Sequence, residues 1–106
     1  MKADIEAIFE FNEERKGKVA SGFRPSHLVK GDYLTTGLHK YYEADVQTSG
    51  NLMGTITFIS PEEYQGSLWE GKRIPMYDGS RFIGDAIVTK IFNPILKRNS
   101  LPAEDS

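Results

Sequence analysis

Two histidines and two neighbouring carboxylates are the residues of this chain whose types could hold a metal ion. His27 and His39 lie twelve positions apart, with Asp32 and Glu43 close to them in the sequence. Two imidazoles and a carboxylate are a known ligand set for transition metals. Isolated histidines in a β protein, however, are more often surface or capping residues. We therefore predict that the chain binds no metal.

The sequence offers no other recognisable catalytic arrangement. It contains no cysteine, which leaves no thiol nucleophile, thiolate metal site or disulfide framework. No nucleophile and base, and no pair of carboxylates, occur at a spacing typical of catalysis. Gly71-Lys72 lacks the upstream glycine and the following hydroxyl of a phosphate-binding loop. We predict that the protein is not an enzyme and uses no cofactor or nucleotide.

A stiff corner around Pro25 is the first candidate binding element. Gly22 frees the backbone, while Pro25 fixes its own φ and pushes Arg24 toward the extended region. The corner is expected to present Arg24 together with Ser26 and His27. Arg24 either pairs with a nearby carboxylate or serves a ligand, and its spacing alone does not decide between the two.

The aromatic residues have two interpretations. They suit stacking of nucleic-acid bases, and they suit core packing equally well. Phe9, Phe11 and Phe58 alternate with polar residues and are predicted to lie in the core. The aromatic residues that are candidates for the surface are Tyr33, Tyr41, Tyr42, Tyr64 and Trp69.

The elements that must position these residues are β-strands, and a hairpin is the clearest of them. Residues 72–77 and 81–92 are predicted to pair across Asp78-Gly79-Ser80, because Asp-Gly favours a tight turn. The side chains predicted to share its buried face are Ile74, Met76, Ile83, Ile87 and Ile91.

Asp85 interrupts this pattern, because it has the same parity as the three isoleucines of its strand. Either a bulge at Gly84 rotates the carboxylate outward, or Asp85 is buried with donors for its oxygens. We favour the bulge.

Further segments also alternate as strands do. Residues 4–11 place one set of side chains on a buried face (Ile5, Ala7, Phe9 and Phe11) and another on a polar face (Asp4, Glu6 and Glu10). Residues 52–59 alternate Ile56 and Phe58 with threonines, and residues 28–36 and 40–46 are β-prone. Between strands, Ser60 to Glu63 predicts one short helical turn near 61–65, closed by a capping box.

The strand count predicts an all-β domain. Five or six strands with turns about every 8 to 12 residues are typical of a barrel or sandwich, and we favour a closed barrel because closure removes edges. A chain of 106 residues fits one domain. We expect the barrel to span residues 1–93 and a tail to span 94–106, with a short apolar start and a polar, partly disordered end. The charged loop 12–18 and the turn 47–51 are expected to be solvated bends.

The order of motifs resembles a known family. An aromatic strand is followed by Gly22-Phe23-Arg24-Pro25, then Thr35-Thr36-Gly37, then a strand ending near Ser60-Pro61, and then residues 68–92. From about residue 4 to residue 93, this order is similar to that of the C-terminal β-barrel domain of bacterial elongation factor Tu. The resemblance implies a six-stranded antiparallel closed β-barrel that does no chemistry.

In that family, the barrel contacts the backbone and ribose of the aminoacyl-tRNA T-stem, and it also meets the GTPase domain and the nucleotide-exchange factor. The resemblance therefore implies contacts that position RNA without reading its sequence. The RNA-binding residues that it implies are Arg24, Ser26, Ser60, Asp78, Gly79 and Arg81.

The chain departs from the family at this site. Ser26 and Ser60 stand where the family carries a glutamine and a lysine, Ser80 replaces a glycine, and residues 36–39 replace a threonine-rich segment. Losing one phosphate-neutralising lysine lowers the salt slope of RNA binding by about one unit. The family's GTPase domain and middle barrel have no counterpart in this sequence.

Two kinds of partner remain open. The chain has 13 Lys and Arg against 15 Asp and Glu, a net charge of −2, so RNA binding requires cations gathered locally. The first hypothesis is a module that binds tRNA. The second is a protein-interaction module, acting as an adaptor, decoy or inhibitor, that keeps the barrel without RNA binding. Four further cations distinguish the two hypotheses: Lys72, Arg73, Arg81 and Lys90. If they converge with Arg24 on one face, RNA binding is favoured. If they are dispersed among carboxylates, protein binding is favoured.

The sequence predicts a cytoplasmic protein without a membrane segment. No apolar run approaches the roughly 20 residues that span a bilayer, and the N-terminus lacks the apolar core of a signal peptide.

Overall fold

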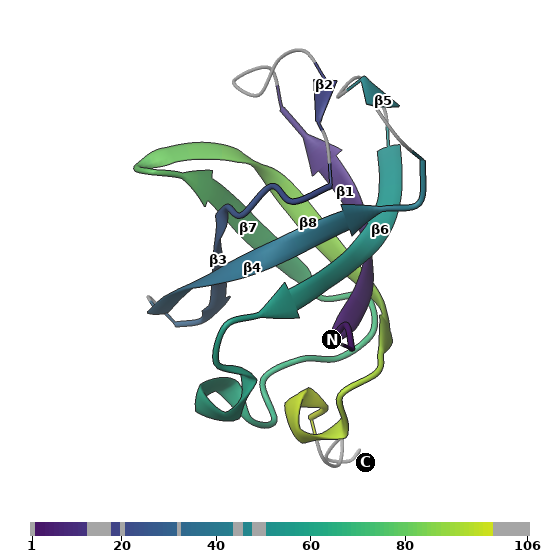
Figure 1. Ribbon diagram of the computed structural model, residues 1–106. Helices are drawn as coiled ribbons and strands as arrows, with labels where there is room; N and C mark the ends of the chain where they lie inside the picture. Colours follow the sequence, from purple (N-terminus) through teal and green to yellow (C-terminus); the bar gives the residue numbers. More distant parts are fainter. Residues whose placement is uncertain are drawn as a thin grey trace.

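Six antiparallel strands close into a β-barrel in the computed structural model, which describes residues 2–12, 18–19, 21–31, 33–43, 46–47 and 51–98. The strands are β1 (Ile5–Phe11), β3 (Ser26–Lys30), β4 (Tyr33–Tyr41), β6 (Asn51–Phe58), β7 (Arg73–Asp78) and β8 (Arg81–Ile91). Around the barrel they follow the order β1, β6, β4, β3, β7, β8, and β8 pairs again with β1 (Figure 1). The predicted fold class is confirmed.

Short elements lie at the two ends of the barrel. β2 (Lys18–Val19) and β5 (Val46–Gln47) form a two-stranded ribbon at one end, and two single 3-10 turns lie at the other, η1 (Pro61–Tyr64) and η2 (Pro94–Leu96) (Figure 1). η1 confirms the turn predicted near 61–65. The predicted capping box is wrong, because the Ser60 side chain makes no cap hydrogen bond and only its carbonyl accepts the Glu63 N–H. Within the described part of the chain, no helix is long and apolar enough to cross a membrane.

The core follows from the period-2 alternation of the strands. Ile5, Ala7 and Phe9 of β1 are fully buried, as predicted, and Phe11 packs at the edge of the core. Ile56 and Phe58 of β6 face the same interior. Every barrel strand therefore contributes one face to a single apolar core.

The β7–β8 hairpin turns through Gly79-Ser80, with Asp78 paired to Arg81. Gly79 has a φ of +66°, the left-handed conformation that glycine adopts without steric cost. The predicted hairpin is confirmed, with β7 shifted by one residue from the predicted range.

The bulge predicted at Gly84 is present. Met76 pairs with Gly84 and Tyr77 with Phe82, which makes Ile83 the extra residue on β8. The bulge turns Asp85 outward, where its carboxylate accepts from Arg73 at 3.2 Å. The alternative of a buried Asp85 is excluded.

The same bulge makes one part of the predicted core wrong. Beyond it the parity of β8 reverses, so Ala86 and Val88 point inward and Ile87 points outward. A second register shift, opposite Glu6 and Ala7, lets Ile91 pack against the core as predicted. A bulge inserts one residue, and a single-residue slip exchanges the two faces of a strand.

Asp4 was predicted to lie on the polar face, and this is also wrong. Its side chain is buried, and its two carboxylate oxygens accept from the Phe58 N–H at 2.7 Å and from Asn93 Nδ2 at 2.8 Å. Because both oxygens are hydrogen-bonded, the burial is tolerated. Asp4 thereby ties together the start of β1, the end of β6 and the segment after β8.

The apolar start of the predicted tail packs on this end of the barrel. Leu96 is fully buried, and Leu68 donates its N–H to the Leu96 carbonyl at 2.9 Å. Residues 13–17, 48–50 and 99–106 lie outside the described residues, together with the predictions made for them.

Candidate functional site

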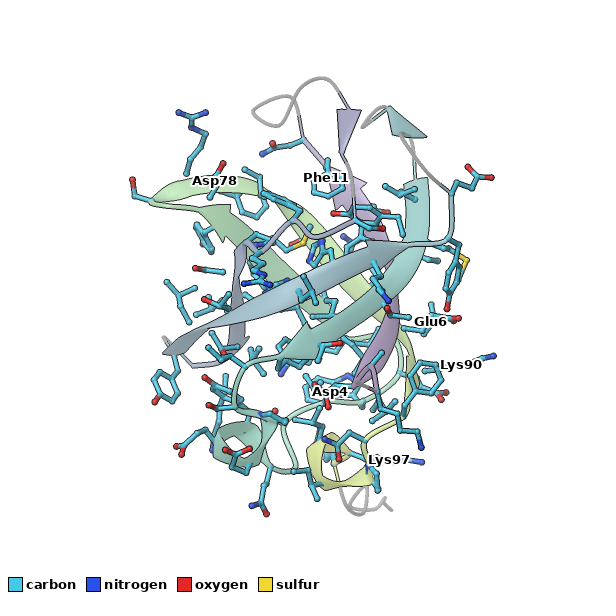
Figure 2. All side chains as sticks on the ribbon, in the orientation of Figure 1. Asp4, Glu6, Phe11, Asp78, Lys90 and Lys97 are labelled. Carbon is cyan, nitrogen blue, oxygen red and sulfur yellow. The ribbon has the colours of Figure 1, made fainter. Side chains whose placement is uncertain are left out.

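The residues implied in RNA binding come from adjoining strands. Ser26 pairs with Thr36 on β4 and with Tyr77 on β7, so three neighbouring strands meet at this residue. Asp78 and Gly79 follow Tyr77 directly at the hairpin turn (Figure 2 labels Asp78). Ser60 lies one residue beyond Ile59, whose N–H donates to the Thr36 carbonyl at 3.1 Å. The tertiary structure therefore brings the separated sequence motifs to one side of the barrel.

An open groove lies on this side, over β4 and the end of β6. Its volume is about 230 Å³, and it is lined by Arg24, Thr36, Leu38, Thr57, Phe58 and Ile59. We call it the Ile59 groove. Pockets for drug-sized ligands are mostly enclosed and roughly 300 Å³ or larger. The Ile59 groove is therefore better suited to a side chain of a macromolecular partner.

Ile59 and Arg24 determine which chemical groups the Ile59 groove presents to solvent. Ile59 is 73% exposed, more than any other large apolar side chain that the structure describes. Arg24 is exposed at the same groove and supplies a guanidinium beside the apolar surface. The floor includes Phe58, which is buried against the core.

The corner that carries Arg24 is held along β4 by backbone hydrogen bonds. The Pro25 carbonyl accepts from the Gly37 N–H at 3.2 Å, and the Phe23 carbonyl accepts from the His39 N–H at 2.9 Å. Gly22 in turn donates its N–H to the His39 carbonyl at 2.8 Å. Pro25 has no N–H to leave unpaired, which suits this buried position.

The other cations named as a test of RNA binding serve structural contacts. Arg73 Nη1 lies 2.9 Å from Glu10 and 3.2 Å from Asp85, and these carboxylates raise its pKa. Lys72 Nζ donates to the Val29 and Ser67 carbonyls, both at 2.7 Å, and burial lowers its pKa. Neither side chain is directed to the Ile59 groove.

Lys90 is also distant from the corner. It pairs in register with Glu6, whose pKa is lowered by hydrogen bonds from Thr89 and Tyr42 and by the Lys90 charge. Figure 2 shows Lys90 and Asp78 on opposite sides of the molecule. Of the cations named for the RNA hypothesis, Arg24 lines the Ile59 groove and Arg81 pairs with Asp78 at the hairpin turn.

His27 and His39 meet inside the barrel, so the prediction that they are surface or capping residues is wrong. Both are fully buried, with their Nε2 atoms 2.8 Å apart. His27 Nδ1 lies 3.3 Å from the Thr35 carbonyl, and His39 Nδ1 lies 2.7 Å from the Tyr41 hydroxyl. Among the described residues, no group of three or more His, Cys, Asp or Glu could hold a metal ion; Asp32 lies outside them.

The geometry assigns each proton of this His27–His39–Tyr41 network. A carbonyl can only accept, so His27 Nδ1 donates to Thr35 and the neutral ring leaves Nε2 as an acceptor. His39 must then donate from Nε2, and its Nδ1 accepts from the Tyr41 hydroxyl. Burial lowers the pKa of His27 to about 4, and burial together with the His27 charge lowers the pKa of His39 well below its usual range.

The aromatic predictions were partly correct. Tyr33, Tyr42 and Trp69 are exposed, whereas Tyr41 and Tyr64 are buried. Sequence reasoning considered the two histidines together as metal ligands but did not predict their contact in the core. Parity was the available signal, because His39 lies an even number of residues from Thr35 and Tyr41 on the same strand.

No family model matches the sequence, and no curated protein matches it at a significant level.

Proposed function

We propose that this chain is a non-catalytic binding module, of the type of the C-terminal barrel of elongation factor Tu, that binds a protein of the translation apparatus through the Ile59 groove. The order of motifs in the sequence supports this kinship, and the closed six-stranded barrel agrees with the fold that the family implies. Fold alone is weak evidence of function. The kind of partner is therefore inferred from the groove.

The observation that carries the proposal is an exposed aliphatic side chain on an apolar groove with an arginine beside it. Ile59 and Leu38 offer the apolar contact, and Arg24 offers a bidentate donor for a carboxylate. Anchors of this kind, an apolar side chain in a groove next to an arginine contact, dominate the free energy of many protein interfaces. The partner segment is expected to insert an apolar side chain and to carry an acidic residue next to it.

Binding of the tRNA backbone is the second candidate. It is favoured by the position of Arg24, Ser26 and the hairpin turn on adjoining strands. Affinity for phosphates, however, requires several cations on one face. Arg73 is bound by two carboxylates, Lys72 donates to carbonyls, and Asp78 adds a negative charge at the turn. We therefore place the protein partner first.

A binding titration tests the proposal with three purified probes: elongation factor Tu, its nucleotide-exchange factor, and tRNA. We expect one of the two proteins to bind, with an affinity that changes little between low and high salt. Ile59→Asp should weaken this binding at least about tenfold, since it places a charge on the apolar contact. The matched control is Phe92→Asp, which changes another exposed apolar residue outside the groove.

A photo-crosslinking residue introduced at position 59 or at position 92 extends the test to cells. A protease-sensitive adduct from position 59 alone is the expected result. If tRNA binds with a salt dependence that Arg24→Ala with Arg81→Ala removes, the RNA hypothesis replaces this one. If neither protein binds and position 59 gives no adduct, the groove is not a binding site.

A further inference from the structure

The His27–His39–Tyr41 network is a titratable cluster inside the barrel that binding at the Ile59 groove does not use. With the protons placed as described above, both imidazoles are neutral and every ring nitrogen has a partner. The network is therefore complete without placing any charge inside the barrel.

The rings around the pair are aromatic, and the hydrogen bond from His27 to the Thr35 carbonyl only partly offsets the effect of burial on the His27 pKa. The Phe9 ring lies 4.4 Å from the His39 ring, and the Phe23 and Phe58 rings approach the two imidazoles by their edges or faces at 5.7 and 5.6 Å. Met76 of β7 pairs with His27 across the sheet. Tyr41 is the titratable neighbour in contact. Apart from the charge of His27, which lowers the pKa of His39, no carboxylate, lysine or arginine among the described residues contributes to the pKa of either imidazole.

Adding a proton places a charge in the buried network. A proton on His39 Nδ1 keeps a partner only if the Tyr41 hydroxyl turns to accept, and a proton on His27 Nε2 opposes the His39 N–H across 2.8 Å. An imidazolium buried among aromatic rings without a counter-charge is strongly disfavoured. The charged pair must therefore reach water.

Of the elements that enclose the two imidazoles, the segment outside the barrel strands should be the easiest to displace. Segment Ser21–Pro25 lies over His39, and Ser21 and Gly22 are exposed. The segment is held by the backbone bonds of Gly22 and Phe23 with His39 and by that of the Pro25 carbonyl with Gly37. The Ser21 hydroxyl also accepts from the Tyr41 N–H at 3.0 Å. The remaining covers are paired barrel strands, whose displacement would open the sheet.

We propose that the His27–His39–Tyr41 network is an acid-operated latch on segment Ser21–Pro25. When the imidazoles are neutral, the segment is closed over His39. When they are protonated, the segment leaves β4 and admits water to the pair, while the rest of the barrel stays closed. This inference does not depend on the identity of the partner or on the function proposed above.

The sign of the pH effect follows from the direction of the pKa shifts. The closed state lowers the pKa of His27 to about 4, whereas an imidazole in water has a pKa near 6.5. The closed state is therefore fully favoured above about pH 6.5, and its population decreases as the pH falls toward about 4. In that window each titrating imidazole shifts the equilibrium about tenfold per pH unit.

A pH titration followed by backbone NMR tests the latch. We expect the amide signals of Gly22, Phe23 and Arg24 to change with a midpoint between about pH 4 and pH 6.5. The amides of Asp4 and Leu68, at the far end of the barrel, should keep their native shifts over this range. If all amides change together, the barrel unfolds as a whole and there is no latch. If the segment does not change above pH 4, the proposal is also wrong.

His39→Gln provides a variant without the titration. Its amide can donate to His27 and its oxygen can accept from Tyr41, so the direction of the network is kept. The pH slope of the transition should fall by about one proton in this variant. Lys40→Gln, which removes an exposed charge next to His39 on the same strand, should leave the transition unchanged. If His39→Gln does not fold, the wild-type titration still decides.

Discussion

Gly84 is the residue on which the course of β8 depends. Its φ of +138° lies outside the range of other residues, and a Cβ there would overlap the Glu10 carbonyl and come within 2.8 Å of the Phe11 Cα. The position therefore combines backbone strain with a close approach of β1. Without a glycine at position 84 the bulge could not form, and Asp85 would face the core.

Substitution of Gly84 by alanine should lower the free energy of unfolding by about 3 kcal/mol or more. Gly79→Ala is the matched control, since Gly79 also has a positive φ, +66°, but a Cβ there meets nothing. That variant should lose about 1 kcal/mol. Urea denaturation measures both, and equal losses would show that the contact with β1 has no energetic weight.

The Thr35 hydroxyl is a second single-residue feature with a measurable consequence. Its Oγ1 is buried and is the one such side-chain atom without a hydrogen-bond partner among the described residues. A buried polar group without a partner is destabilising. Thr35→Val keeps the shape and removes the hydroxyl, so we expect a gain of about 1 kcal/mol in urea denaturation. A loss of stability would mean that the hydroxyl has a partner in solution.

At the scale of elements, the ends of the barrel are secured in different ways. The end near η2 is tied by Asp4, whose carboxylate joins β1, β6 and Asn93. The candidate site lies at the meeting of β3, β4 and β7, where a segment outside the regular strands carries Arg24. The buried Asp4 carboxylate holds one end of the barrel, whereas at the other end the short segment Ser21–Pro25 covers His39. We therefore expect acid to displace segment Ser21–Pro25 before the barrel unfolds.

Asp4→Ala should destabilise the protein by about 3 kcal/mol, because it removes two hydrogen bonds to a charged acceptor and leaves the Phe58 N–H buried without a partner. Asn93→Ala should cost less, because the Phe58 N–H keeps its acceptor. Thermal or urea unfolding compares the two variants. A loss from Asn93→Ala as large as that from Asp4→Ala would contradict this account.

At the scale of the whole molecule, the buried imidazoles make global stability depend on pH. The unfolded chain binds protons near pH 6.5, and the folded chain resists protonation of His27 down to about 4. The contribution of the neutral imidazoles to the free energy of unfolding is therefore fully present above about pH 6.5 and decreases as the pH falls. As long as segment Ser21–Pro25 stays closed, His27 alone should lower the free energy of unfolding by about 3 kcal/mol between pH 7 and pH 4, and opening of the segment reduces this loss.

Urea titrations at several pH values check this expectation. Carboxylates such as Glu6 also contribute to acid sensitivity, so the useful quantity is the difference between wild type and a His27→Gln, His39→Gln variant. The loss on acidification should be smaller in the variant, and the difference should stop growing at the pH at which segment Ser21–Pro25 opens. Parallel curves for the two proteins would show that the pair is not buried in solution.

The Ile59 groove is also a property of the whole molecule, because its side of the barrel is formed by β3, β4, β6, β7 and the corner that carries Arg24. Ile59→Ser should leave the free energy of unfolding within about 0.5 kcal/mol of the wild type, because the side chain is 73% exposed. Binding of the protein partner should nevertheless weaken at least about tenfold. Unfolding measured beside the titration separates the two effects, and unchanged affinity would remove Ile59 from the interface.

The sequence by itself determined the local structure of this protein. Alternation predicted β1 and β6, Asp78-Gly79 predicted the hairpin turn, and Gly84 before Asp85 favoured the bulge. Each of these features depends on neighbouring residues, on the allowed φ of glycine and on the period of a strand. The number of such strands predicted a barrel or a sandwich, and closure was favoured because it removes exposed edges.

Only the tertiary structure decided which separated residues meet. The reversed parity of Ile87, the burial of Asp4 and the contact between His27 and His39 all depend on the register between strands. Register is set by packing across the whole barrel, and a shift of one residue exchanges the inner and outer faces. For the same reason, the sequence identified Arg24 as a candidate, but the Ile59 groove beside it became visible only when β4 and β6 were paired.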